Sequence, residues 1–212
     1  MSPARRDAEE TDGRRIKGER RRRAIIDATL RVIARDGVAA VSHRNIAREA
    51  GVPPASISYY FDGIDDLLVA TLLESCDAFA ADMDALRERV RHHAEWPRAV
   101  AEVLAEMVRE HRERTIGEYE LYLLAARRPA LRPAARRWIE IASGYVNDGK
   151  GGDPPAVRAL FAVLDGLLMQ ALIADEPPTA DELEHTLRYV MQPVDYLRER
   201  GVFPDVPGGA QA

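Results

Sequence analysis

Apolar residues recur three and four positions apart along most of the chain, and no segment alternates as a β-strand does. This pattern predicts an all-α protein. A broad apolar arc over residues 20–36 predicts a first helix. Gly37 ends it, because glycine readily adopts the left-handed conformation that follows many helices. Further helices are expected at residues 43–50, 55–61, 65–90, 97–112, 115–127, 133–146 and 156–174, and a last one after a capping box of Thr179 and Glu182.

Two short helices joined by a tight turn fall in the first third of the chain. Ser42 is placed to cap the helix over residues 43–50 by accepting a hydrogen bond from its first turn. Gly51 ends that helix. Pro53 and Pro54 then suit the start of the next one, where a missing N–H is tolerated. This arrangement is typical of a helix-turn-helix.

The second of these short helices carries an aromatic cluster. Ile57 and Phe61 lie four positions apart and share a face that can be buried. Tyr59 and Tyr60 fall outside that face, and a tyrosine can lean on a small core while its hydroxyl donates to a phosphate. The cluster therefore favours a recognition helix in a DNA groove. The alternative is a small helical core with surplus tyrosine.

Charge is distributed unevenly along the 212 residues, whose net charge is −5. Residues 1–61 hold 13 basic and 8 acidic side chains, whereas the remainder holds 17 basic and 27 acidic ones. A basic front on an acidic body predicts a polyanionic partner for the front. A basic disordered tail would give a similar local charge, and we expect residues 1–18 to be disordered.

Other functional classes find little support. Cys76 is the single cysteine, so no intrachain disulfide is possible, and no signal-peptide core or apolar run long enough for a membrane span is present. We expect a cytoplasmic protein without contact to a membrane. No catalytic motif is found, so we expect no enzyme, no cofactor and no metal. Residues 144–151 match a phosphate-binding loop only in part, and the adjacent His92 and His93 would point to different sides of a helix.

The stretch "RRAIIDATLRVIARDGVAAVSHRNIAREAGVPPASISYYFDGIDDLL", residues 22–68, resembles the N-terminal domain of the TetR family of transcriptional regulators. The resemblance implies an N-terminal helix-turn-helix three-helix domain and a C-terminal helical ligand-binding and dimerisation domain. It also implies a homodimer on a pseudo-palindromic operator in double-stranded DNA. We expect a tail at residues 1–18, the DNA-binding domain at 19–64, the effector-binding and dimerisation domain at 65–203, and a flexible tail at 204–212.

The resemblance also indicates which residues meet the DNA. They are expected to be Ser42, His43 and Arg44 at the start of the second helix, Pro54, Ala55, Ser56 and Ser58 at base edges, and Tyr59 and Tyr60 at the DNA backbone. Two positions depart from the family. Ser58 stands where tyrosine is more common, and Ile64 stands where a phosphate-contacting lysine is common. Arg44, or the arginines at positions 20–23, could supply that charge.

The C-terminal part carries the predicted dimer interface. The helix at 156–174 is apolar on more faces than one core needs, and the last helix has a seam of branched residues. The predicted interface residues are Leu160, Leu164, Leu168, Leu183, Leu187, Val190 and Val194. Asp165 either pairs within the structure or faces a ligand, because a buried carboxylate without a partner is costly.

A small-molecule pocket is predicted among the middle helices, where polar groups interrupt apolar ones. The candidate residues are Met107, His111, Tyr119, Tyr122, Leu123 and Trp138. They could instead fill a core, because periodicity does not distinguish a cavity from a packed centre. The first hypothesis is therefore a sequence-specific transcriptional repressor that a small, largely hydrophobic ligand releases from its operator. The alternatives are a DNA-binding protein without an effector and an enzyme with a helical body.

Overall fold

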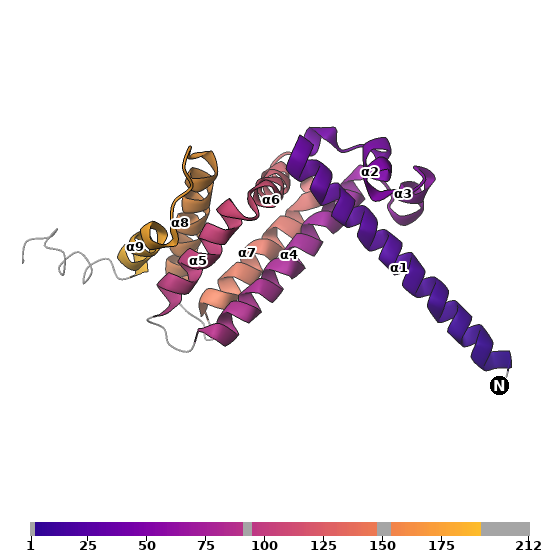
Figure 1. Ribbon diagram of the computed structural model, residues 1–212, viewed down its shortest axis with the longest axis horizontal. Coiled ribbons are helices and arrows are strands. Elements are labelled where there is room, and N and C mark those ends of the chain that lie inside the picture. Colours follow the sequence, from indigo (N-terminus) through magenta and orange to yellow (C-terminus); the bar gives the residue numbers. More distant parts are fainter. Residues whose placement is uncertain (1–2, 91–94, 148–153, 192–212) are drawn as a thin grey trace, which may run out of the picture. The chain divides into compact units, whose positions relative to one another are not determined.

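The computed structural model describes residues 3–90, 95–147 and 154–191 of the chain (Figure 1). Every regular element within these ranges is a helix, which confirms the predicted all-α class. The elements are α1 (Pro3–Asp36), η1 (Val38–Ala40), α2 (His43–Ala50), α3 (Ala55–Tyr60), α4 (Ile64–Arg89), α5 (Trp96–Arg109), α6 (Arg112–Leu124), η3 (Pro129–Leu131), α7 (Arg132–Asn147), α8 (Pro154–Ile173) and α9 (Ala180–Met191).

Helix α1 is longer than the apolar pattern predicts. It begins at Pro3 and therefore includes residues that we expected to form a disordered tail. Alanine, arginine, glutamate and lysine dominate this segment, and their high helix propensity allows a helix without a continuous apolar face. Three other expectations lie wholly or partly outside the described residues. They concern the histidines at 92 and 93, positions 148–151 of the partial phosphate-loop match, and the tail at 204–212.

The chain forms two compact units. The N-terminal unit comprises residues 1–79 and 113–139, and the C-terminal unit comprises residues 80–112 and 140–212. Helices α4 and α7 contribute residues to both units. The helix-turn-helix thus belongs to a unit that also contains α6, η3 and the first part of α7. The predicted domain limits at residues 19, 65 and 204 stay predictions.

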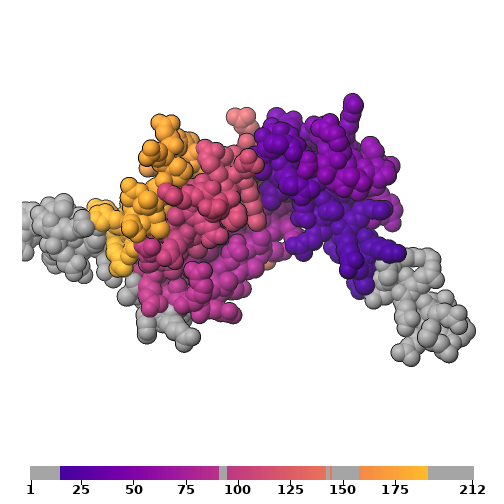
Figure 2. Space-filling model, viewed as in Figure 1, coloured from indigo at the N-terminus to yellow at the C-terminus, as the bar shows by residue number. Residues whose placement is uncertain are grey.

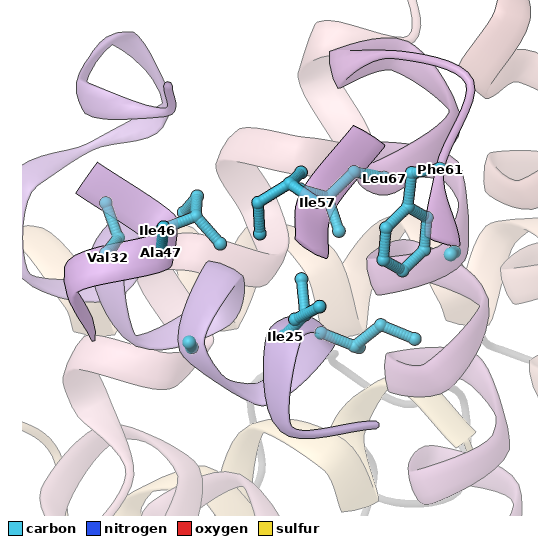
Figure 3. Packing of buried hydrophobic residues seen from close by; sticks show 10 residues of the cluster. Ile25, Val32, Ile46, Ala47, Ile57, Phe61 and Leu67 are labelled. Carbon is cyan, nitrogen blue, oxygen red and sulfur yellow. The ribbon is translucent and has the colours of Figure 1, made fainter. Parts of the chain in front are cut away.

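The helices of the helix-turn-helix are held together by a small apolar core (Figure 3). Ile25 of α1, Ile46 of α2 and Ile57 of α3 are completely buried, and Phe61 and Leu67 close the cluster beside them. Fully burying an aliphatic side chain stabilises a fold by about 1.5–3 kcal/mol. Three such side chains, one from each helix, therefore fix α3 relative to α1 and α2.

A second cluster joins α1 and α4 to α6, η3 and α7 in the same unit, with Leu72, Leu121 and Leu131 at its centre. Next to it, α6 approaches α1 very closely. A Cβ atom added at Gly117 would lie 3.1 Å from the backbone nitrogen of Ala34. Contact between two helix backbones at this distance requires glycine, which predicts that a larger residue at this position would push the helices apart.

A carboxylate on α6 also caps the turn that follows α1. The backbone N–H of Val38 donates to Oε2 of Glu120 at 2.6 Å. The neighbouring Gly37 has a positive φ of 80°, and a Cβ atom there would lie 3.5 Å from the same carboxylate oxygen. Gly37 ends α1 as predicted. Nothing local in the sequence indicates Glu120, because 82 positions separate it from Val38.

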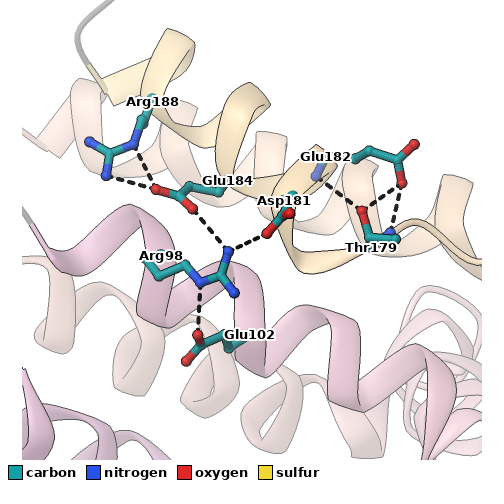
Figure 4. A network of polar contacts seen from close by, with 7 residues as sticks. All are labelled: Arg98, Glu102, Thr179, Asp181, Glu182, Glu184 and Arg188. Carbon is teal, nitrogen blue, oxygen red and sulfur yellow. Dashed lines mark hydrogen bonds and ion pairs between the residues drawn. The ribbon is translucent and has the colours of Figure 1, made fainter.

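In the C-terminal unit, α5 packs against α9 and α8. Arg98 of α5 bonds Glu102 on its own helix and reaches Asp181 and Glu184 on α9 (Figure 4). The predicted capping box at the start of α9 is confirmed. The Thr179 N–H donates to Glu182 Oε2 at 2.8 Å, and the Glu182 N–H donates back to Thr179 Oγ1 at 3.3 Å.

Candidate nucleic-acid interface

Helix α2 is fixed at both ends by groups that sequence analysis identified. Ser42 has an extended backbone, and its Oγ accepts a hydrogen bond from the Asn45 N–H at 3.2 Å. Asn45 in turn donates from its side chain to the Ala40 carbonyl at 2.8 Å. At the other end Gly51 adopts the left-handed conformation, with φ 64°. The predicted cap and stop of this helix are therefore confirmed.

His43, the first residue of α2, is only partly accessible. Its Nε2 atom is buried and has no hydrogen-bond partner within the described part of the chain. A phosphate beside this residue would therefore meet its Nδ1 atom or its backbone N–H. Arg44 is exposed, and it forms no ion pair with any residue that the structure describes. Arg44 thus has its full charge available at the start of α2.

Helix α3 presents most of the predicted base-edge positions to solvent. Pro54, Ala55 and Ser58 are exposed, and Ser56 is half-buried. Ile57, on the opposite face, is completely buried and anchors the helix. The exposed face therefore consists of small side chains, which would let a groove of DNA approach the helix backbone closely.

The two tyrosines at the end of α3 have different environments. Tyr59 is 81 % exposed, whereas Tyr60 is half-buried and packs against the apolar core. Their rings make an edge-to-face contact, with centroids 4.9 Å apart. A Cβ atom at Gly18 would lie 3.8 Å from the Tyr60 hydroxyl, so this hydroxyl reaches α1. Tyr59 is therefore the tyrosine that projects from the domain, and Tyr60 supports it.

Surface ion pairs connect α1 to α2. Arg31 and Arg35 of α1 both reach Glu49 of α2, at 3.0 and 3.1 Å. The hydrogen bonds from Arg31 and Arg35 lower the pKa of the Glu49 carboxyl. Arg35 also bonds its neighbour Asp36. These two arginines are consequently neutralised within the fold, and phosphate binding would fall to other basic residues.

The six candidate ligand residues are divided between the two units. Met107 and His111 belong to the C-terminal unit, and the other four belong to the N-terminal unit. Trp138 stacks on Phe79 with ring centroids 4.9 Å apart, and Leu123 is 55 % exposed. Tyr122 packs against the second apolar cluster. The proposed pocket stays a prediction.

Three of the seven predicted dimer residues are buried in the single chain. They are Leu168, Leu183 and Leu187, with Leu187 only 1 % exposed. At Leu183 and Leu187 the seam of α9 packs within its own chain, and the dimer interface stays a prediction. Leu160, Leu164, Asp165 and Val190 are half-buried, and Val194 lies outside the described residues.

The apolar residues that α8 and α9 leave exposed are different ones. Met169 is 48 % exposed, Ile173 84 % and Tyr189 41 %. Ala162, Gly166, Met169 and Ile173 follow one another at spacings of four, three and four, so they form one stripe on α8. A seam pattern shows that a helix packs, but it does not distinguish packing within a chain from packing on a second copy.

No helix in the described segments combines the length and hydropathy needed to cross a membrane.

An N-terminal helix-turn-helix followed by a helical body defines a class of bacterial DNA-binding regulators. Residues 25–71 match the family described as "Bacterial regulatory proteins, tetR family", and residues 93–193 match "Tetracyclin repressor-like, C-terminal domain". The chain belongs to the TetR family of transcriptional regulators. The resemblance expected from residues 22–68 is thereby confirmed.

Similarity to individual proteins extends over both units. The multidrug binding protein EbrR, solved in complex with ethidium, is 40 % identical over 80 % of this chain and 97 % of that chain, with a TM-score of 0.70. The transcriptional regulator PksA of Bacillus subtilis is 29 % identical over 87 % of this chain and 93 % of PksA. The regulator BetI of Rhizobium meliloti is 50 % identical over 52 residues, so the chain spans about a quarter of BetI (26 %).

Proposed function

We propose that this protein is a cytoplasmic transcriptional repressor, not an enzyme, that binds a pseudo-palindromic operator and is released from it by a small, largely hydrophobic ligand. The observation that carries the proposal is the exposed face of α3. This face lies opposite the buried Ile57 and ends in the highly exposed Tyr59. It can enter a major groove, with small residues against base edges and Tyr59 against a phosphate.

Binding to a pseudo-palindrome requires two copies of α3, and therefore a homodimer. The stripe of Ala162, Gly166, Met169 and Ile173, which is exposed except at the half-buried Gly166, supports such an assembly. Small residues at 162 and 166 allow close approach of a second helix, and Met169 and Ile173 supply apolar area. In this dimer the two copies of α3 would meet half-sites separated by about 34 Å, one turn of DNA.

The ligand class is inferred from EbrR, which has been solved with ethidium, proflavin and malachite green. All three are aromatic, largely apolar cations at neutral pH. Aromatic ring faces attract cations, and the candidate ligand residues include Tyr119, Tyr122 and Trp138. A lipophilic aromatic cation is therefore the first ligand class to test.

The experiment begins with selection of operator sequences from random duplexes, followed by affinity measurement at increasing salt. A dimer that neutralises roughly 6–10 phosphates should lose about 10³–10⁵ in affinity between about 50 and 200 mM salt. The Tyr59→Ala variant should bind all sequences more weakly, whereas Ser56→Ala should change the selected sequence. Failure to enrich any sequence would contradict the function.

Ligand binding should be measured on the protein alone, because ethidium and proflavin also bind DNA directly. Calorimetry with malachite green would give its affinity, and operator release would then be followed at saturating dye. An unrelated helix-turn-helix protein on its own operator serves as the control. Release of this protein but not of the control supports a ligand-released repressor. Operator binding that no dye affects supports the alternative of a regulator without this effector.

A further inference from the structure

The middle of α1 concentrates positive charge next to the helix-turn-helix. The nine residues from 15 to 23 hold six basic side chains and one acidic one. Lys17, Arg20 and Arg21 are exposed, and none of them forms an ion pair with a residue in the described part of the chain. They lie three and four positions apart and therefore share one side of α1.

The two arginines that follow have partners in the fold. The guanidinium of Arg22 lies over the ring of Phe61, 5.2 Å from its centroid, and Arg23 pairs with Glu74 of α4. Like charges at helical spacing repel one another, so these three cations, which have no ion pair among the described side chains, disfavour the isolated helix. A polyanion bound along that side would reverse this effect.

The basic side chains start beside the end of α3. Gly18 lies next to the Tyr60 hydroxyl, and Tyr60 contacts the ring of the exposed Tyr59. From this contact α1 continues past α2 and α3 toward its N-terminus (Figure 1). The side chains of residues 15–17 of α1 are exposed at the surface, within the part coloured indigo in Figure 2. DNA held by α3 and Tyr59 would therefore reach α1 just beyond the contacted groove.

The start of α4, which follows α3 in the chain, supplies no positive charge. Ile64 there has a half-buried apolar side chain that packs against the second apolar cluster, and Asp65 and Asp66 follow it. The four helical steps from position 17 to position 21 span about 6 Å. This length corresponds to about two phosphates along one strand at roughly 3.4 Å of helix axis each.

We propose that Lys17, Arg20 and Arg21 bind phosphates of the double-stranded DNA that flanks each operator half-site. The inference rests on the proposed function, because it assumes that α3 occupies the half-site. Contacts of this kind add affinity without reading sequence. The footprint of the dimer would therefore extend outward beyond the base pairs that selection conserves.

The test compares full-length protein carrying Arg20→Ala and Arg21→Ala with a control carrying Arg127→Ala and Arg136→Ala. The control removes the same charge from exposed positions in the same unit. Two selected duplexes are used, one trimmed to the conserved base pairs and one with ten further base pairs on each side. Affinity is measured from about 50 to 200 mM salt, and circular dichroism verifies that each variant is helical.

On the long duplex the α1 variant should lose four phosphate contacts per dimer. The slope of log affinity against log salt should then become shallower by about 3–4. Over that salt range the affinity of the parent would fall about 10²-fold further than that of the variant. The parent should bind the trimmed duplex more weakly, and with a slope still shallower than that of the variant on the long duplex, because trimming also removes the Lys17 contacts. The control should match the parent on both duplexes.

Several results would overturn the proposal. The first is a variant that keeps the parent's salt slope on the long duplex. The second is a variant that loses the same affinity on both duplexes, which would place the two arginines within the half-site. A variant with Arg20→Lys and Arg21→Lys keeps the charge and should keep the slope, and a loss there would exclude a charge contact. Failure of the parent to bind either duplex would contradict DNA binding itself, whereas a parent that binds equally well to both contradicts only the α1 contact.

Discussion

The hydrogen bond from the Val38 N–H to Glu120 leads to a test of how α6 supports the DNA-binding helices. In Glu120→Ala the N–H of Val38 loses its carboxylate partner. Hydrogen bonds to charged groups contribute about 1.5–3 kcal/mol, and a buried donor left unpaired costs about 1–3 kcal/mol. This bond is only partly buried, so water can replace some of the lost interaction. Alanine also favours a helix by a few tenths of a kcal/mol.

The expected net loss in the free energy of unfolding is therefore about 1–2.5 kcal/mol for Glu120→Ala. Glu120→Gln keeps a neutral acceptor and should lose about half of that. Both can be measured by urea unfolding, with Glu140→Ala as the control, because Glu140 is an exposed residue of α7. The control should stay within about 0.5 kcal/mol of the parent.

Amide hydrogen exchange adds a local measurement. The Val38 N–H should exchange faster in Glu120→Ala than in the parent, while amides in the middle of α5 stay unchanged. Equal midpoints for Glu120→Ala and Glu140→Ala, together with an unchanged exchange rate at Val38, would refute the reasoning. The Glu120 carboxylate would then contribute nothing measurable to stability, and the close approach at Gly117 alone would hold α6 against α1.

Three further predictions concern other parts of the chain. Ile173→Asp should give monomers in sedimentation experiments, and these monomers should remain helical; a stable dimer of this variant would exclude the α8 stripe as the interface. Leu187→Ala should instead lower the free energy of unfolding by about 2–5 kcal/mol, because it leaves a cavity. Gly51→Ala should cost about 1–2 kcal/mol in a urea titration, because its φ of 64° strains any residue with a Cβ atom; no loss would mean that the turn relaxes. Burial raises the pKa of the Cys76 thiol from 9.0 to about 11. Ionisation then favours the unfolded chain, so stability should fall between about pH 9 and 11 by at most about 3 kcal/mol; a Cys76→Ala variant with the same pH dependence would assign the fall to other groups.

Features that depend on neighbouring residues could be predicted from the sequence. The Ser42 cap, the end of α2 at Gly51 and the capping box at Thr179 each involve groups within four positions, and the structure contains all three. The buried role of Ile57 followed equally from helical spacing. Local geometry fixes these contacts whatever the rest of the chain does.

Features that depend on distant segments could not be predicted. Spacing correctly indicated that Leu183 and Leu187 belong to a packed seam, but it did not show that both are already buried within the single chain. The separate roles of Tyr59 and Tyr60 depend on Gly18, which lies 42 positions before Tyr60 and has no side chain to suggest a contact. The extension of α1 to Pro3 was missed because its polar sequence has propensity for a helix without periodicity.

The approach of α6 to α1 at Gly117 has a mechanical consequence. Side chains between two helices usually act as a soft layer, because rotamers can change and absorb small displacements. At Gly117 that layer is missing, and one backbone rests on the other within van der Waals contact. A sliding of α6 by a fraction of an ångström would therefore be passed to the end of α1 without being damped. We therefore expect α6 and the end of α1 to move together at this point, next to the turn that leads into the DNA-binding helices.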